Sequence, residues 1–157
     1  MSTMEKKMEL MARCLTAGTE NERDLARETL RTMLTAAPVV LDREEEICRI
    51  LLELGVPDHI KGHRYLVKAI DLAVEVPELL DSVTKELYPR TAMAFGSTSS
   101  RTERAIRHAI ETAWLRCDLK TMARYFGSTV DVNRGKPTNS EFIARIANLV
   151  RRWEKAA

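Results

Sequence analysis

Three charged residues at helical spacing are the side chains of this sequence best suited to chemistry. Glu103, Arg104 and Arg107 fall in the first half of an expected helix from about Ser100 to Arg116. Arginine can donate two hydrogen bonds to O6 and N7 of guanine, and glutamate can accept one from N4 of cytosine. The first two turns of this helix could therefore read the edges of base pairs in double-stranded DNA.

The two faces of the same helix would position those side chains. At about 100° per residue, apolar residues converge on one side and polar residues on the other. The apolar side holds Ile106, Ala109, Ile110 and Ala113, and the polar side holds Ser100, Arg104, Arg107, His108 and Glu111. A short helix from Tyr88, a turn at Gly96 and then this longer helix have the layout of a helix-turn-helix.

The same charges also fit a simpler role. Glu103 stands three residues after Ser100, as in a capping box, and four residues before Arg107. Arg107 in turn stands four residues before Glu111, and such pairs stabilise an exposed helix by about 0.2–0.5 kcal/mol each. From these residues alone, DNA reading and a solvated helix face both remain open.

Other kinds of chemistry find less support in the sequence. His59 and His63 stand four residues apart, a spacing that zinc tolerates, but no further ligand is evident nearby. Three cysteines, Cys14, Cys48 and Cys117, cannot all pair in disulfides, which favours a reducing compartment. Cys117 is either a thiol of lowered pKa beside basic residues or, more simply, a small packed side chain. The sequence has no phosphate-binding G-x-x-x-x-G-K-[ST] loop, and we expect no enzyme, no metal and no cofactor.

Composition bounds the class of protein. The chain has 157 residues, 45% of them hydrophobic and 31% charged, which allows one domain or one domain plus an appendage. No stretch approaches the about 18 apolar residues of a membrane helix, and the N-terminus is too charged for a signal peptide. Only six glycines and five prolines occur, so helices are favoured over strands. We expect a cytoplasmic protein with no membrane partner.

The near-neutral net charge of +2 conceals an uneven distribution. Residues 1–47 hold ten acids and seven bases, whereas residues 48–157 hold 18 bases and 13 acids. Seven of those bases lie between Arg90 and Arg124, where there are three acids. Basic segments often bind polyanions, although a solvated surface of mixed charge would look the same in the sequence.

Capping patterns and apolar periodicity predict the helices. Capping pairs spaced three residues apart are Thr19 with Glu22, Asp42 with Glu45, and Thr138 with Glu141. Apolar stripes are Met4, Met8, Met11 and Leu15; Ala26, Leu30 and Met33; Ile47, Ile50, Leu51 and Leu54; Tyr65, Leu66, Ala69, Ile70 and Ala73; and Phe142, Ile146, Leu149, Val150 and Trp153. A further helix is expected over Leu119 to Phe126, and residues 128–136 could form a brief strand or a loop.

The predicted fold class is all-α: a compact helical bundle that contains a helix-turn-helix, preceded by a short N-terminal helical pair. A break at Ala36-Ala37-Pro38 separates the two parts. We therefore expect an appendage over residues 1–41 and a helix-turn-helix domain over residues 42–157.

Five strings of residues carry a resemblance to a known family. They are LGVPDHIKGHRYL (54–66), TKELYP (84–89), SRTERAIRHAIETAW (100–114), FGSTV (126–130) and KPTNSEFIA (136–144). Over about 110 of the 157 residues, the sequence resembles the C-terminal DNA-binding effector domain of the response regulators that start sporulation in endospore-forming bacteria, the stage zero sporulation protein A family.

The resemblance implies how DNA would be read. The family's recognition helix reads a box related to TGTCGAA, usually in tandem copies that dimers occupy. Its base-reading pair falls on Glu103 and Arg104, and its next basic contact on Arg107. Ser100 and Arg101 match positions near the phosphates, where a helix N-terminus also favours an anion. We add His108 from the same polar face to this set of DNA-binding candidates.

Other matched positions are less specific in role. His59, Lys61 and Lys136 match the family's strings, with either a DNA-backbone or a structural role. The segment 117–130 falls where the family contacts the RNA polymerase sigma factor, but Lys120, Ala123 and Arg124 change its character.

Two departures from the family pattern alter the expectations. Met93-Ala94 stand where the family commonly carries two lysines, so the dependence of log affinity on log salt should be flatter by up to about 0.9 per lost phosphate contact. Residues 1–47 are too short for the family's receiver domain, so we expect no control by aspartyl phosphate within this chain. The Met-rich first helix and its partner helix could instead mediate dimerisation or bind a partner, or they could pack on their own domain. The rival to a DNA-binding regulator is an antagonist whose N-terminal helices bind a full-length regulator.

Overall fold

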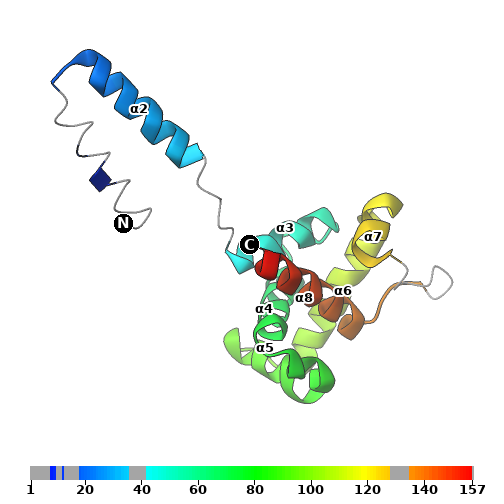
Figure 1. The fold of residues 1–157 in the computed structure, drawn as a ribbon. Coiled ribbons are helices and arrows are strands. Elements are labelled where there is room, and N and C mark those ends of the chain that lie inside the picture. Colours follow the sequence, from blue (N-terminus) through cyan, green and yellow to red (C-terminus); the bar gives the residue numbers. More distant parts are fainter. Residues whose placement is uncertain (1–7, 10–11, 13–17, 36–41, 128–134, 157) are drawn as a thin grey trace. The chain divides into compact units, whose positions relative to one another are not determined.

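The protein is described here from a computed structural model, which places residues 8–9, 12, 18–35, 42–127 and 135–156 (Figure 1). The chain divides into two compact units, Met1–Val40 and Leu41–Ala157. The Met-rich face predicted for the first segment, apart from Met8, and the strand or loop predicted at residues 128–134 lie outside the described residues.

The described elements are all helical, as the sequence predicted. The first unit contains α2 (Glu20–Thr35). The second unit contains α3 (Arg43–Glu53), α4 (Lys61–Glu75), the 3₁₀ helix η1 (Pro77–Ser82), the π-helical turn η2 (Val83–Leu87), α5 (Tyr88–Ala94), α6 (Ser99–Arg116), α7 (Leu119–Phe126) and α8 (Asn139–Ala156). Within the placed segments, no helix is long and apolar enough to cross a membrane.

Helix α2 is described by itself. Thr19 caps it by accepting a hydrogen bond at Oγ1 from the backbone N–H of Glu22, 3.4 Å away, as predicted. Ala26 and Leu30 of the predicted apolar side are half-buried, whereas Leu25 is 71% exposed. This helix therefore leaves apolar surface in solvent.

Helix α4 is the centre of the second unit and packs against α3, α5, α6 and α8 (Figure 1). Its apolar stripe is buried as predicted, with Leu66, Ala69, Ile70 and Ala73 each 0% exposed. The stripes of α3, α6 and α8 meet it, through residues that include Leu51, Ile106, Ile110, Phe142, Ile146 and Val150. Burial on this scale is the main force that holds the bundle together.

Gly62 sets how closely α4 crosses α6. A Cβ atom added at this residue would lie 2.7 Å from the Cβ of Ala109 and even closer to the carbonyl oxygen of Ala105. Such separations are below van der Waals contact, so only glycine allows the two backbones to approach this far. The position of α6 thus depends on a residue of α4.

Helix termini follow the predicted caps with two exceptions. Thr138 and Glu141 form the predicted capping box: Thr138 N–H donates to Glu141 Oε2 at 2.9 Å, and Glu141 N–H donates to Thr138 Oγ1 at 3.2 Å. Asp42 stands at the N-cap of α3 without a side-chain cap bond. At α6 the cap is Thr98, whose Oγ1 accepts from the backbone N–H of Arg101 at 3.3 Å, so the capping box considered for Ser100 was wrong.

Helix α7 is held by a charged network around Glu53. The Glu53 carboxylate accepts hydrogen bonds from Arg124, at 2.6 Å, from Arg49 and from the Tyr125 hydroxyl. The bond from Tyr125 is the main reason why the pKa of Glu53 is lowered. Arg145 of α8 donates to the Tyr125 carbonyl oxygen at 2.6 Å, so α3 and α8 together fix α7.

Candidate nucleic-acid interface

The turn between α5 and α6 is short and has a defined geometry. After Phe95, Gly96 has a φ of +59°, which favours glycine. The backbone N–H of Ser97 donates back to the Ala92 carbonyl oxygen at 2.9 Å and closes the end of α5. Thr98 then begins α6 as its N-cap, so four residues separate the two helices.

Aromatic packing fixes this turn against α4. The Phe95 ring lies 5.1 Å from the Tyr65 ring, centroid to centroid, and the Arg64 guanidinium lies 5.1 Å over Phe95. Such contacts stabilise by about 0.5–1.5 kcal/mol for an aromatic pair. The start of α6 is therefore tied to α4 through the turn as well as through the core.

The apolar side of α6 anchors it in the bundle, as predicted. Ile106, Ala109, Ile110 and Ala113 are buried, each at most 1% exposed. Thr102, on the first turns of the same side, is 0% exposed. With this side fixed, the opposite side must face outward.

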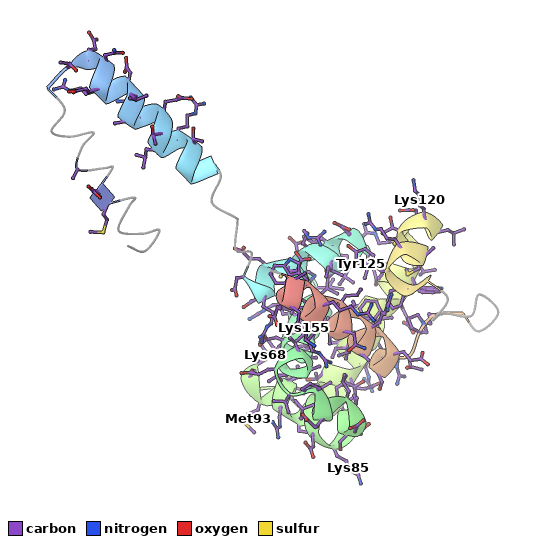
Figure 2. All side chains as sticks on the ribbon, viewed as in Figure 1. Lys68, Lys85, Met93, Lys120, Tyr125 and Lys155 are labelled. Atoms are coloured by element: carbon purple, nitrogen blue, oxygen red, sulfur yellow. The ribbon has the colours of Figure 1, made fainter. Side chains whose placement is uncertain are left out.

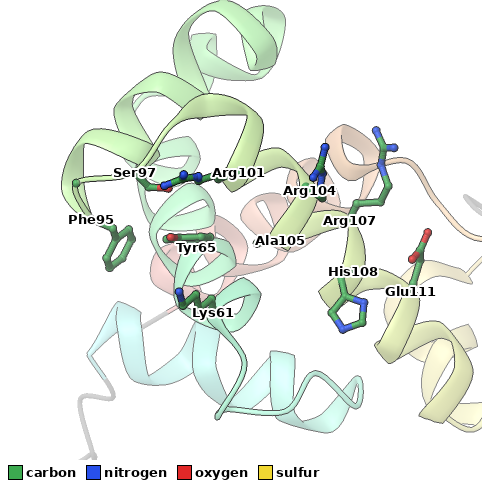
Figure 3. Close-up of a pocket in the computed structure, with 11 residues that line it drawn as sticks. Lys61, Tyr65, Phe95, Ser97, Arg101, Arg104, Ala105, Arg107, His108 and Glu111 are labelled. Atoms are coloured by element: carbon green, nitrogen blue, oxygen red, sulfur yellow. The ribbon is translucent and has the colours of Figure 1, made fainter.

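The polar side of α6 lines an open hollow of about 730 Å³ (Figure 3). Its lining from α6 comprises Arg101, Arg104, Ala105, Arg107, His108 and Glu111. Lys61 and Tyr65 of α4 and residues 95–97 of the turn complete the lining. The four basic side chains from α6 lie on one surface with Lys61, as a polyanion-binding face requires.

The arginines on this surface differ in their partners. Arg107 pairs with Glu103 one turn earlier, as the spacing suggested. The side chains of Arg101 and Arg104 are exposed and have no hydrogen-bond or ion-pair partner among the residues that the structure places. Their guanidiniums are therefore available to an external ligand.

Glu111 pairs with a different residue from the one that its helical spacing suggested. Its carboxylate pairs with Lys136, which precedes α8, rather than with Arg107. This bond is the main cause of the lowered pKa of Glu111. Ser100 is exposed on the first turn of α6, and His108 is exposed two turns further on. All six candidate residues thus lie on the outward part of one helix.

Asn139 is a residue of this region that the sequence reasoning missed. It is the first residue of α8, and its side-chain amide nitrogen donates to the Tyr88 hydroxyl at 3.1 Å and to the Glu103 backbone oxygen at 3.4 Å. The only indication of this role in the sequence was that Asn139 lies in the string KPTNSEFIA, which carries the family resemblance. The two contacts join α8 to both helices of the helix-turn-helix.

Other candidate side chains have different surroundings. His59 is exposed and His63 is 5% exposed, and no group of three metal-ligating side chains occurs within the placed segments. Burial raises the pKa of the Cys117 thiol, so the idea of a lowered pKa there was wrong. Met93, where the family commonly has a lysine, is 80% exposed and points outward (Figure 2).

These features define a class of protein. A short helix, a tight glycine turn and a longer helix that is anchored behind and basic in front form a helix-turn-helix, an arrangement that many DNA-binding proteins use.

The comparison with known families agrees with this geometry. The family model described as "Sporulation initiation factor Spo0A C terminal" matches residues 47–150. The chain belongs to this family, and the matched part is a DNA-binding domain of a sporulation regulator.

Proposed function

We propose that the protein is a sequence-specific regulator of transcription that places the N-terminal half of α6 in the major groove of double-stranded DNA. The observation that carries the proposal is the exposed Arg104 guanidinium, which has no partner among the placed residues and stands beside Arg107 and Glu103. A guanidinium without an internal partner can donate two hydrogen bonds to guanine without first breaking an ion pair.

Each candidate residue has a role in this proposal. Arg104 reads guanine, while Glu103 accepts from cytosine or holds Arg107 in place for a second base contact. Ser100 and Arg101, at the N-terminus of α6, bind phosphate, where the helix dipole adds a favourable field. His108 lies one turn beyond Arg104, towards the far edge of the site. The expected target is a TGTCGAA-like box, as the family resemblance implies.

Fluorescence anisotropy with a labelled TGTCGAA duplex and a scrambled duplex of the same composition tests this proposal. Arg104→Ala should weaken binding to the box by about 1–3 kcal/mol, or roughly 5- to 150-fold, and change binding to the scrambled duplex little. Arg116→Ala is the matched control, because Arg116 is an exposed arginine in the last turn of the same helix. The proposal is contradicted if the wild type binds both duplexes with equal affinity, or if Arg104→Ala binds the TGTCGAA duplex as tightly as the wild type does.

We also propose a partner-binding role for the first unit. The first unit, Met1–Val40, precedes the matched range, and its helix α2 exposes Leu25. Apolar surface on a short helix gains stability by burial against another surface, for which a second copy of the chain is the simplest choice. Sedimentation of the full chain and of a version that begins at Asp42 tests this role. If both proteins sediment as monomers, the role as a dimerisation unit is contradicted.

A contact with the polymerase sigma factor through α7 is the remaining proposal. Its support is the family resemblance together with the exposure of Leu119 (88%) and of Lys120 (Figure 2). Lys120→Glu should reduce promoter activation without a matching loss of DNA binding. Equal loss of both would contradict a separate sigma contact.

A further inference from the structure

We propose that Asn139 is a positioning residue for base reading, which holds the recognition helix α6 at a fixed place relative to its supporting helix α5. This inference rests on the proposed function. The side-chain amide of Asn139 contacts two helices. It donates to the hydroxyl of Tyr88, the first residue of α5, at 3.1 Å, and to the backbone oxygen of Glu103 in α6 at 3.4 Å.

The chemistry of these two contacts requires an amide. A backbone carbonyl oxygen only accepts hydrogen bonds, so the group that faces Glu103 must be a donor. The amide nitrogen of asparagine carries two hydrogens, one for each partner, whereas a serine hydroxyl has one and a carboxylate has none. Asparagine is therefore the short side chain that can join these two oxygens at once.

Asn139 is itself held rigidly. The capping box of Thr138 and Glu141 fixes the start of α8, and Phe142 and Ile143 in the next turn are 0% exposed. Because Asn139 is fixed by α8 and not by α6, it can define the position of α6.

The two contacts also lie where they affect base reading. Asn139 lines a hollow of about 380 Å³ together with Tyr88, Glu103, Arg107 and Lys136. The bonded carbonyl belongs to the same residue as the carboxylate that pairs with Arg107, and Arg104 follows directly in the chain. A shift of α6 at this point moves all three base-reading side chains, whereas phosphate contacts by long, flexible cations tolerate it.

Asn139 should therefore affect discrimination between sequences more than electrostatic affinity. We expect Asn139→Ala to lower the ratio of affinities for the TGTCGAA box and a scrambled duplex by about tenfold, the scale of one hydrogen bond. Binding to the scrambled duplex and the salt dependence should stay as in the wild type, because no phosphate contact is lost. Asn148→Ala, an exposed asparagine of the same helix, is the control and should change nothing.

Asn139→Asp separates positioning from folding. Aspartate keeps the size of the side chain and is favourable at a helix N-terminus, and the Tyr88 hydroxyl can still donate to it. The hydrogen bond to the Glu103 oxygen is replaced by repulsion between two acceptor oxygens, so the ratio of affinities should again fall. The melting temperature shows that the fold is kept. Tyr88→Phe removes the other partner of Asn139. Its effect on the ratio of affinities should not add fully to that of Asn139→Ala.

The outcomes of this experiment are distinct. A wild type that binds both duplexes equally overturns the proposed function and this inference with it. A wild type that discriminates, together with Asn139→Ala and Asn139→Asp variants that discriminate equally well, overturns the role of Asn139 alone. Equal weakening of both duplexes by Asn139→Ala also overturns it, since that is the signature of lost folding or lost phosphate contacts.

Discussion

Replacement of Gly62 by alanine tests how closely α4 and α6 cross. The new Cβ would lie 2.7 Å from the Cβ of Ala109 and 3.0 Å from the carbonyl carbon of Ala105. Ordinary contacts between carbon atoms are about 3.5–4.0 Å, so the helices must separate by about 1 Å. The obstructing atoms belong to the backbone of Ala105 and to a Cβ, neither of which can rotate away.

The magnitude follows from two opposing effects. Overpacking of a core costs about 1–3 kcal/mol, and the upper end applies here because backbone must move. The higher helix propensity of alanine returns up to about 1 kcal/mol. The net loss of about 2 kcal/mol in the free energy of unfolding corresponds to a fall of roughly 8 °C in melting temperature, at about 4 °C per kcal/mol for a domain of this size.

Thermal and urea denaturation, followed by circular dichroism, measure this loss. Lys61→Ala is the control, because Lys61 is the exposed neighbour in the same helix turn and should change stability little. A Gly62→Ala variant as stable as the wild type, or more stable, would refute the close crossing, because helix propensity would then be the only effect that acts.

Three further predictions concern charge and capping. Burial lowers the pKa of His63, so the unfolded chain takes up the proton first as the pH falls. The free energy of unfolding should then decrease below about pH 6.5 in urea titrations, and less so in His63→Gln; an equal pH dependence of both proteins would contradict this. Lys136→Ala leaves Glu111 without its ion-pair partner on the surface that we propose faces DNA, and it should weaken DNA binding. The double variant with Glu111→Gln should regain much of that affinity. A double variant as weak as Lys136→Ala would instead indicate a direct phosphate contact by Lys136. Thr138→Ala removes the α8 cap and should cost about 1 kcal/mol of stability in urea, and an unchanged midpoint would show that the cap contributes nothing.

Local patterns in the sequence were enough to predict most of the helices. Periodic apolar residues identified the buried sides of α4, α6 and α8, because burial of a stripe is what stabilises a helix in a bundle. The helix expected over Leu119 to Phe126 has these same bounds in the structure, as α7.

Contacts between distant residues could not be predicted in this way. Asn139 meets Glu103 and Tyr88 across 36 and 51 residues, and Glu53 meets Tyr125 across 72. Local spacing in the sequence does not specify which distant partner a polar side chain finds after the bundle forms. For the same reason Glu111, with Arg107 at a favourable helical spacing, pairs with Lys136 instead.

The cap of α6 shows a competition between local signals. Both Thr98 and Ser100 carry a hydroxyl suited to an N-cap, and Glu103 favoured Ser100 by its spacing. The structure uses Thr98, because the helix then begins directly after the turn that Gly96 and the packing of Phe95 define. Tertiary packing thus decided between two candidate caps.

Affinities of the wild type and of Arg104→Ala for every single-base variant of the TGTCGAA box, at fixed salt, distinguish base reading by Arg104 from a phosphate contact. We predict that the wild type loses about 1–3 kcal/mol at each contacted base pair, and that Arg104→Ala loses its preference at one of these base pairs while it keeps the preferences at the others. A uniform loss of affinity across all variants, with the pattern of preferences unchanged, would contradict it.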